Sequence, residues 1–264
     1  MAANIVVLMK QVPDNTKLRV DSALTAMPAP GGPSPVDMMM NPFDEYALET
    51  ALRLKDSWGG DTTVTALSLG HDSVKALLKK AIAAGADAAF IVGETAPLDG
   101  FQRATVLAKA VQTLVPDAVL VLGGHSSLDE AGHQTAAMTA EALGWPSLSG
   151  VKLAEGDTSS LTVSRVGDGG LEQHRMTLPG VLATIKCDYE LRTSNIKGVM
   201  KANKTDIPVK SLADIGVTLP SATTTLIQLS PRPAKAAGQV ITADGNEDAA
   251  IDAVVAYLKA QKFA

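Results

Sequence analysis

The sequence predicts an α/β fold: a mostly parallel sheet with helices on both faces, an antiparallel extension and a C-terminal arm. Three observations predict it. Before Pro146, short β-rich apolar runs alternate with helical patterns, which is typical of a parallel sheet covered by helices. After Pro146, strand-like runs follow one another with only turn residues between them. The last part is a proline-containing segment that ends in one amphipathic helix.

Four strands and four helices are predicted in the first part, each from its own local pattern. The strands are apolar runs of strand length, at Asn4–Met9, Thr62–Ser68, Ala88–Val92 and Ala118–Leu122. The helices carry apolar residues three and four positions apart, at Phe43–Ser57, Ser73–Ala84, Ala104–Val115 and Leu128–Leu143. Gly85 and Pro116 end the second and third helices. The segment Met27–Pro35 contains too much proline for a strand or a helix and is expected to be a loop.

The second part is expected to extend the same sheet, because it is too small to form a good core of its own. Its predicted strands are Val151–Ala154, Leu161–Val166, Leu171–Leu178 and Val181–Lys186. Beyond Tyr189 the chain is polar and is expected to be irregular to about Val209. A long arm follows at Pro220–Gly238, and the last helix, Asp248–Lys259, places Ile251, Val254, Val255 and Leu258 on one side. Such an arm is more easily explained if it wraps a partner.

The composition excludes several classes of protein. The chain has 264 residues, of which 46% are hydrophobic, and a net charge of −5, so no overall positive field attracts nucleic acid or anionic lipid. Aromatic residues make up 3%, which leaves little for stacking on bases. The single cysteine, Cys187, excludes an intramolecular disulfide framework and a cysteine-rich metal site. No signal peptide and no membrane span are recognised, so a cytoplasmic protein is expected.

Common enzyme motifs are absent from the sequence. It contains no G-x-G-x-x-G, no G-x-x-x-x-G-K-[ST], no H-E-x-x-H and no G-x-S-x-G. The four histidines show no metal-ligand spacing; they are His71, His125, His133 and His174. An enzyme therefore ranks last among the functions considered, and neither a catalytic residue nor a metal ligand is assigned.

Two strand–loop–helix junctions are candidate ligand sites. Gly123 and Gly124 follow the most apolar strand, and Ser127-x-x-Glu130 has the spacing of a capping box at a helix start. Glycines allow close approach of a ligand, and a helix start offers unpaired N–H groups to an anion. The alternative is an ordinary capped helix after a turn.

The second junction begins at Asn41-Pro42, where Asn41 is predicted at the N-cap, Pro42 at the first helical position and Asp44 in the first turn. On its own this pattern is more simply explained as a good helix cap. Two such helix starts at one sheet edge would nevertheless suit a single phosphate-bearing ligand.

Taken together, these junctions resemble those of the β subunit of electron transfer flavoprotein. The similarity covers nearly the whole chain, and the order and spacing of its segments carry it. The segments are Lys10–Asp14, Asn41–Glu45, Lys79–Asp87, Gly124–Thr135, Asp168–Glu172, Leu178–Val181 and Val199–Ala202.

The resemblance implies a Rossmann-like fold of the adenine nucleotide alpha hydrolase type and a non-enzymatic electron-carrier subunit. In that family the β subunit pairs with an α subunit that carries FAD, and the heterodimer takes electrons from flavin dehydrogenases to an acceptor. The β subunit has no catalytic residues and buries one AMP, with the phosphate expected at the N–H groups near Gln134 and Thr135. By position, the expected AMP contacts are Leu8, Asn41, Pro42, Phe43, Asp44, Leu69, Gly124, His125, Ser126, Ser127, Leu128, Asp129, Glu130, Ala131, Gly132, His133, Gln134 and Thr135.

The family's dehydrogenase-recognition loop corresponds to Tyr189–Lys204. Its hydrophobic anchor is expected at Ile196, with Lys201 and Lys204 as flanking basic residues. The alternative for Ile196 is packing onto its own subunit. The implied organisation is a nucleotide-binding domain at 1–188, a recognition loop at 189–210 and an arm with its helix at 211–264 that wraps the α subunit.

The chain departs from the family pattern at three places. Asn15 stands where an aromatic residue lies against the flavin, Val166 stands in place of an acidic residue, and Pro-Arg is missing before the anchor. Two alternatives stay open. One is the electron-bifurcating branch, with a second FAD in the nucleotide site, although the loop ending His-Gln-Thr is more similar to the AMP-binding branch. The other is a stand-alone nucleotide-binding regulatory protein.

Overall fold

The computed structural model describes residues 3–14, 16, 37–93, 98–225, 227–228, 238 and 240–263. The chain divides into two compact units, residues 1–228 and residues 229–264, and each is described here by itself. The loop predicted at Met27–Pro35 and position Asn15 lie outside the described residues, as does most of the arm after Gln228. The predicted division into a nucleotide-binding domain at 1–188, a recognition loop at 189–210 and an arm at 211–264 rests on expected roles, and it stays a prediction.

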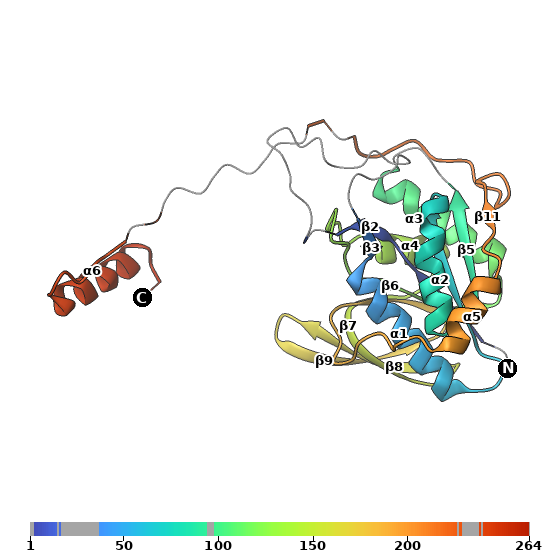
Figure 1. The fold of residues 1–264 in the computed structure, drawn as a ribbon, viewed down its shortest axis with the longest axis horizontal. Helices are drawn as coiled ribbons and strands as arrows, with labels where there is room; N and C mark the ends of the chain where they lie inside the picture. Colours follow the sequence, from blue (N-terminus) through green and yellow to red (C-terminus); the bar gives the residue numbers. More distant parts are fainter. Residues whose placement is uncertain are drawn as a thin grey trace. The chain divides into compact units, whose positions relative to one another are not determined.

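The first unit is built on a nine-stranded sheet in the order β11-β5-β4-β1-β6-β10-β7-β8-β9 (Figure 1). Strands β11 to β7 in this order run parallel, and β8 and β9 continue the sheet antiparallel. The strands are β1 (Asn4–Leu8), β4 (Thr63–Gly70), β5 (Ala88–Gly93), β6 (Ala118–Gly124), β7 (Ser147–Gly156), β8 (Ser160–Gly167), β9 (Gly170–Thr177), β10 (Gly180–Thr184) and β11 (Val209–Lys210). Two short strands, β2 (Gln11–Pro13) and β3 (Met38–Met40), form a separate antiparallel pair.

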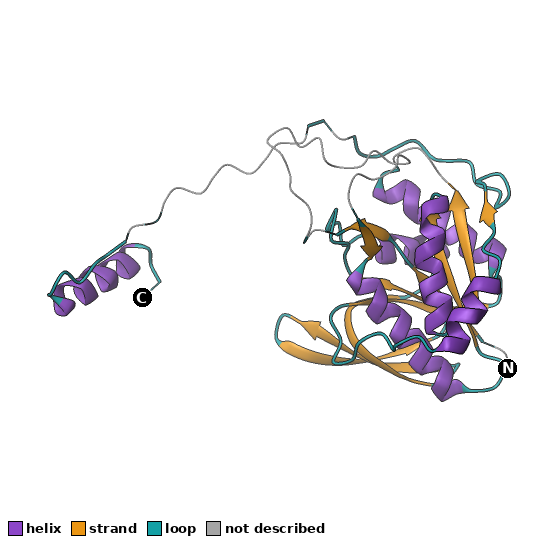
Figure 2. Ribbon diagram, viewed as in Figure 1, coloured by secondary structure: helices purple, strands orange, loops and turns teal. Residues whose placement is uncertain are grey.

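Helices cover both faces of this sheet (Figure 2). Successive side chains of a strand point to opposite faces: Ile5 packs in the cluster with helices α1 and α2, whereas Val6 packs in the cluster with α3 and α4. The predicted α/β class is therefore confirmed. The helices of this unit are α1 (Pro42–Trp58), a 3₁₀ turn (Asp72–Val74) that leads into α2 (Lys75–Ala84), α3 (Gly100–Leu114), α4 (Thr135–Leu143) and α5 (Ile196–Lys204).

Two strands of the predicted antiparallel extension, β7 and β10, are parallel members of the sheet. The segment predicted at Val181–Lys186 forms β10, which lies between β6 and β7 and runs parallel to both. All five of its residues are buried, because α1 packs on one face and α4 on the other. A continuous apolar run is typical of such a two-sided strand, and Val-Leu-Ala-Thr has that character.

Two helix predictions need correction. The helix expected from Leu128 begins only at Thr135, because Ala131 and His133 adopt left-handed backbone conformations with φ of 49° and 55°. The segment expected to be irregular after Tyr189 contains α5, whose first turn is capped by Asn195: its side-chain oxygen accepts a hydrogen bond from Gly198 N at 2.8 Å.

The second unit contains α6 (Glu247–Ala260), which includes the helix predicted at Asp248–Lys259. Asn246 caps it by accepting a hydrogen bond from Ala249 N at 3.1 Å. Within the described residues of this unit, none of the helical side chains is buried. The apolar stripe of α6, formed by Ile251, Val254, Val255 and Leu258, is between 38% and 59% exposed. Among the described residues, no helix is both long and apolar enough to span a membrane.

Candidate functional site

A pocket opens at the carboxyl ends of β1, β4 and β6, where an open α/β sheet offers its strand ends and loops to a ligand. Thirteen of the residues expected to contact AMP line it: Leu8, Asn41, Asp44, Leu69, Gly124, His125, Ser126, Ser127, Glu130, Gly132, His133, Gln134 and Thr135. Five expected contacts are not in its lining: Pro42, Phe43, Leu128, Asp129 and Ala131.

The pocket also contains eight residues outside the expected AMP contacts, of which Gly123 belongs to a predicted ligand junction. Met9 and Lys10 continue β1, Leu67 belongs to β4, Gly123 to β6 and Ala136 to α4, and three more come from α3: Gly100, Arg103 and Leu107. Lys10 could have been found from its place after the first strand. Helix α3 had no such signal, because its predicted pattern gives only an apolar face and no ligand motif.

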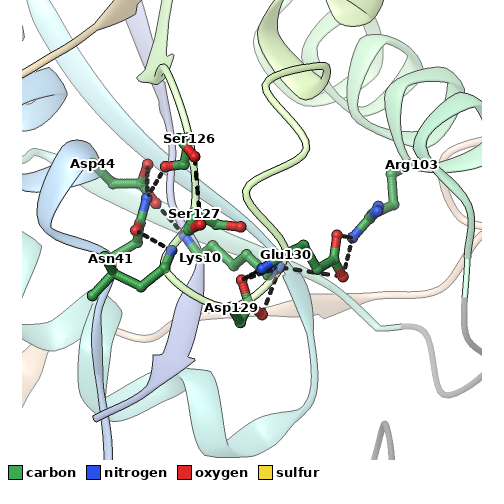
Figure 3. Close-up of polar contacts among 9 residues, drawn as sticks. Lys10, Asn41, Asp44, Arg103, Ser126, Ser127, Asp129 and Glu130 are labelled. Carbon is green, nitrogen blue, oxygen red and sulfur yellow. Dashed lines mark hydrogen bonds and ion pairs between the residues drawn. The ribbon is translucent and has the colours of Figure 1, made fainter. Parts of the chain in front are cut away.

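Asp44 lines the pocket and ties three segments together; Figure 3 shows it beside Asn41. Its buried carboxylate accepts hydrogen bonds from Lys10 N at 2.7 Å, Gly124 N at 3.0 Å and Asn41 Nδ2 at 3.0 Å. Burial raises the pKa of Asp44 to about 7, although these hydrogen bonds and the Lys10 charge favour the ionised form. A side chain at Gly124 would collide with Asp44 and Phe43, which explains glycine at this position.

Asn41 occupies the predicted N-cap position of α1, but its side chain makes no capping hydrogen bond. It donates instead to Ser126 O at 2.8 Å and accepts from Leu128 N at 3.3 Å. The predicted cap is therefore wrong in detail: Asn41 holds the loop after β6 against the start of α1.

Ion pairs hold the loop between β6 and α4 in place. Lys10 Nζ lies 2.8 Å from Asp129 Oδ2 and 3.4 Å from Glu130 Oε1, and Arg103 Nη1 lies 2.6 Å from Glu130 Oε2 (Figure 3). Although burial alone would raise the pKa of Asp129, the Lys10 charge and the hydrogen bonds outweigh it and hold that pKa below its ordinary value. The acidic pair Asp129-Glu130 thus binds cations from β1 and α3 instead of starting a helix, which corrects the predicted capping box at Ser127.

The start of α4 lines the pocket and has no side-chain cap. Gln134 is its N-cap residue and makes no side-chain capping bond, and Thr135 and Ala136 line the pocket. Unpaired N–H groups and the positive end of the helix dipole make such a start suitable for an anion. Nearby, the rings of His125 and His133 lie 4.6 Å apart, and burial and His133 lower the pKa of His125.

The lining combines an apolar surface with a helix start. Leu8, Leu67, Leu69 and Leu107 provide apolar surface for a base, and the start of α4 provides donors for a phosphate. In the part of the chain that the structure describes, no group of three His, Cys, Asp or Glu side chains is arranged to hold a metal ion.

Comparison with known proteins identifies the family. The family model for the electron transfer flavoprotein domain matches residues 34–215. The chain belongs to the electron transfer flavoprotein family. It is 32% identical to the electron transfer flavoprotein subunit beta of Mycobacterium tuberculosis strain H37Rv, over 98% of this chain and 99% of that protein. The protein of the same name from Megasphaera elsdenii is 30% identical, again over 98% and 99%.

The three residues expected to bind partners differ in their contacts: Lys201 is bonded within the subunit, whereas Ile196 and Lys204 are exposed and neither has a side-chain hydrogen bond or ion pair with another described residue. Ile196 is the first residue of α5 and is 79% exposed, and Lys204 is exposed at the end of that helix. Lys201 is bound within the subunit, because its Nζ donates to Ala86 O at 3.0 Å and lies 3.6 Å from Asp87. Val166, at the position where the resemblance leads us to expect an acidic residue, is 44% exposed on β8.

The segment before Ile196 is fixed to α1 through Arg192, although it lacks the Pro-Arg pair expected from the resemblance. Arg192 donates through N, Nε and Nη2 to the buried carboxylate of Glu49, at 3.0 to 3.1 Å, and through Nη1 to Asp56 at 2.9 Å. These hydrogen bonds raise the pKa of Arg192. The anchor position thus follows a well-held segment.

Proposed function

We propose that this chain is the AMP-holding subunit of a heterodimeric electron carrier, with no catalytic residues of its own. The observation that carries the proposal is the pocket at the carboxyl ends of β1, β4 and β6, where apolar leucines lie near the uncapped start of α4. An adenine base suits the apolar lining, and a monophosphate suits the N–H groups of Thr135 and Ala136.

The proposed partner is an α subunit that carries the redox-active FAD. Nine aromatic residues in the whole chain are few for a subunit that holds a flavin in its own pocket. The exposed stripe of α6 supplies apolar surface that the described residues of its unit leave uncovered, and this is expected of a segment that binds another chain.

The proposed docking segment for flavin dehydrogenases is 189–204. Its exposed Ile196 projects from the start of a helix that is fixed to the subunit through Lys201 and through Arg192. An exposed aliphatic side chain on a rigid base suits transient docking into a partner's apolar pocket. Lys204 adds a positive charge that would steer an acidic partner.

The test is co-purification with the α subunit followed by analysis of the cofactors released by heat. One AMP and one FAD for each heterodimer is the expected result. Two FAD and no AMP would overturn the AMP assignment in favour of a bifurcating carrier. A chain that forms stable homodimers and has no affinity for a flavin-bearing α subunit would be a stand-alone nucleotide-binding protein.

A further inference from the structure

Arg103 lines the pocket and has one side-chain nitrogen without a hydrogen-bond partner among the described residues. It lies in the first turn of α3, and its side chain is 25% exposed. Both carboxylate oxygens of Glu130 approach the same nitrogen, Nη1, at 2.6 and 2.8 Å. Its Nε is buried and has no hydrogen-bond acceptor among the described residues. A buried N–H without an acceptor is unfavourable, so this one calls for a partner that the described residues do not provide.

The geometry of a guanidinium group indicates what that partner is. Nε–H and the neighbouring Nη2–H form a flat edge that matches two oxygens of a carboxylate or phosphate. Because Glu130 is bound at Nη1, the Nε edge is left for a second oxyanion. The carboxylates of the loop are already matched with cations, Glu130 with Arg103 itself and Asp129 with Lys10 at 2.8 Å. The carboxylate of Asp99 accepts hydrogen bonds from Gln102 N at 2.8 Å and Thr224 N at 3.0 Å.

The surroundings of Arg103 favour negative charge. Gly100, where α3 begins, and Thr135, where α4 begins, both line the pocket. The two helix starts are neighbours, since a Cβ added at Gly100 would lie 2.7 Å from Oε1 of Gln134. The start of α3 is closed by the capping box of Asp99, whereas the start of α4 has no side-chain cap. The start of α4 and Arg103 therefore line the same pocket, and both are suited to an anion.

We propose that Arg103 binds the phosphate group of the nucleotide through its Nε edge while Glu130 stays on Nη1. The proposal rests on the proposed function, that the pocket holds an adenine nucleotide. Arg103 thereby makes the site selective for the phosphorylated nucleotide over its nucleoside, a specificity that backbone N–H groups alone provide more weakly.

The experiment compares AMP with adenosine, titrated into the full-length chain after removal of bound nucleotide. In Arg103→Met, AMP is expected to bind about tenfold to a hundredfold more weakly, while adenosine affinity stays within about twofold. Arg103→Lys should restore part of the loss, because it returns the charge without the planar edge. Lys109→Met is the matched control, since it removes a cation from an exposed position of the same helix and should leave both affinities unchanged.

Glu130→Gln separates phosphate binding from a merely structural role. If Arg103 only tethers the loop through Glu130, both Glu130→Gln and Arg103→Met should weaken AMP and adenosine equally, and that result would overturn the proposal. Unchanged AMP affinity in Arg103→Met would overturn it as well. A wild-type chain that binds neither AMP nor adenosine would instead refute the proposed function, and the proposal with it.

Discussion

Asp44 shows how one buried side chain fixes the site. Its two oxygens accept hydrogen bonds from the end of β1, the start of α1 and the end of β6, so three separate segments share one carboxylate. A carboxylate with three donors is well satisfied, yet its burial favours the protonated form. Hydrogen bonding favours the ionised form of Asp44 and burial favours the protonated form, so the contribution of Asp44 to stability depends on pH.

Replacing Asp44 with Asn is expected to lower the free energy of unfolding by about 1–3 kcal/mol, because the new amide group faces a backbone donor. The wild-type pKa is raised from 3.8 to about 7, so the native state binds the extra proton and its stability falls as pH rises through this window. The variant lacks that dependence. Urea unfolding of both proteins at pH 5 and pH 8 should show a smaller difference at pH 8. A difference that grows toward pH 8 would mean that the hydrogen bonds outweigh burial.

Thr135 is the first residue of α4 and lines the pocket. A larger side chain at this position would fill the space beside the N–H groups at the start of α4. We expect Thr135→Trp to block nucleotide binding and weaken assembly with the α subunit. Glu141→Trp adds the same ring at an exposed position of the same helix and should retain AMP. The measurement is AMP released by heat per chain, and a full complement from Thr135→Trp would remove the start of α4 from the site.

At the scale of elements, α5 is a short helix held from two sides. Gly198 packs so closely on Ala83 of α2 that a side chain there would collide with the Ala83 carbonyl. Lys201 bonds to the loop after α2, and Arg192 fixes the preceding segment on α1. The backbone that carries the exposed Ile196 is therefore held in one position before a partner binds. Less conformational entropy is lost on binding as a result.

Ile196→Ala is accordingly expected to slow electron transfer from the dehydrogenase by about tenfold, since a few buried apolar contacts dominate such docking surfaces. AMP content and heterodimer formation should not change. Leu171→Ala is the control, because Leu171 is also apolar and 71% exposed but lies on β9. Stopped-flow transfer rates test this, and equal rates in wild type and Ile196→Ala would refute the anchor.

Elements were predictable where local pattern decides them. The apolar runs of β1 and β6 and the spacing in α1 and α3 each follow from neighbouring residues, so the parallel sheet and its carboxyl edge could be predicted. The capping-box spacing at Ser127 failed because Lys10 and Arg103 bind the acidic pair of the loop, and both cations come from distant parts of the chain. Arg103 was missed for the same reason: only the packing of α3 beside α4 brings it to the pocket.

At the scale of the whole molecule, the two units contribute differently to stability. Both hydrophobic clusters lie within residues 1–228, whereas α6 has no buried residue among those described. Apolar burial is the main stabilising contribution in a domain, so the first unit carries the stability of the fold. Within its own unit the apolar stripe of α6 is not buried by the described residues, and we propose that it binds another chain.

Replacing Ile251, Val254, Val255 and Leu258 with Ser is expected to weaken binding of the α subunit by at least about tenfold, because an apolar helix face is lost from the interface. The unfolding midpoint of the chain alone should stay within about 3 °C, since no buried group is removed. Replacing Asp252 and Lys259 of the same helix with Ser is the matched control, which changes helix propensity but keeps the stripe. Titration of the α subunit with each variant measures the effect. Equal affinity of the stripe variant and the control would place the contact with the α subunit outside α6, and a large fall in the midpoint would show that the stripe packs within this chain.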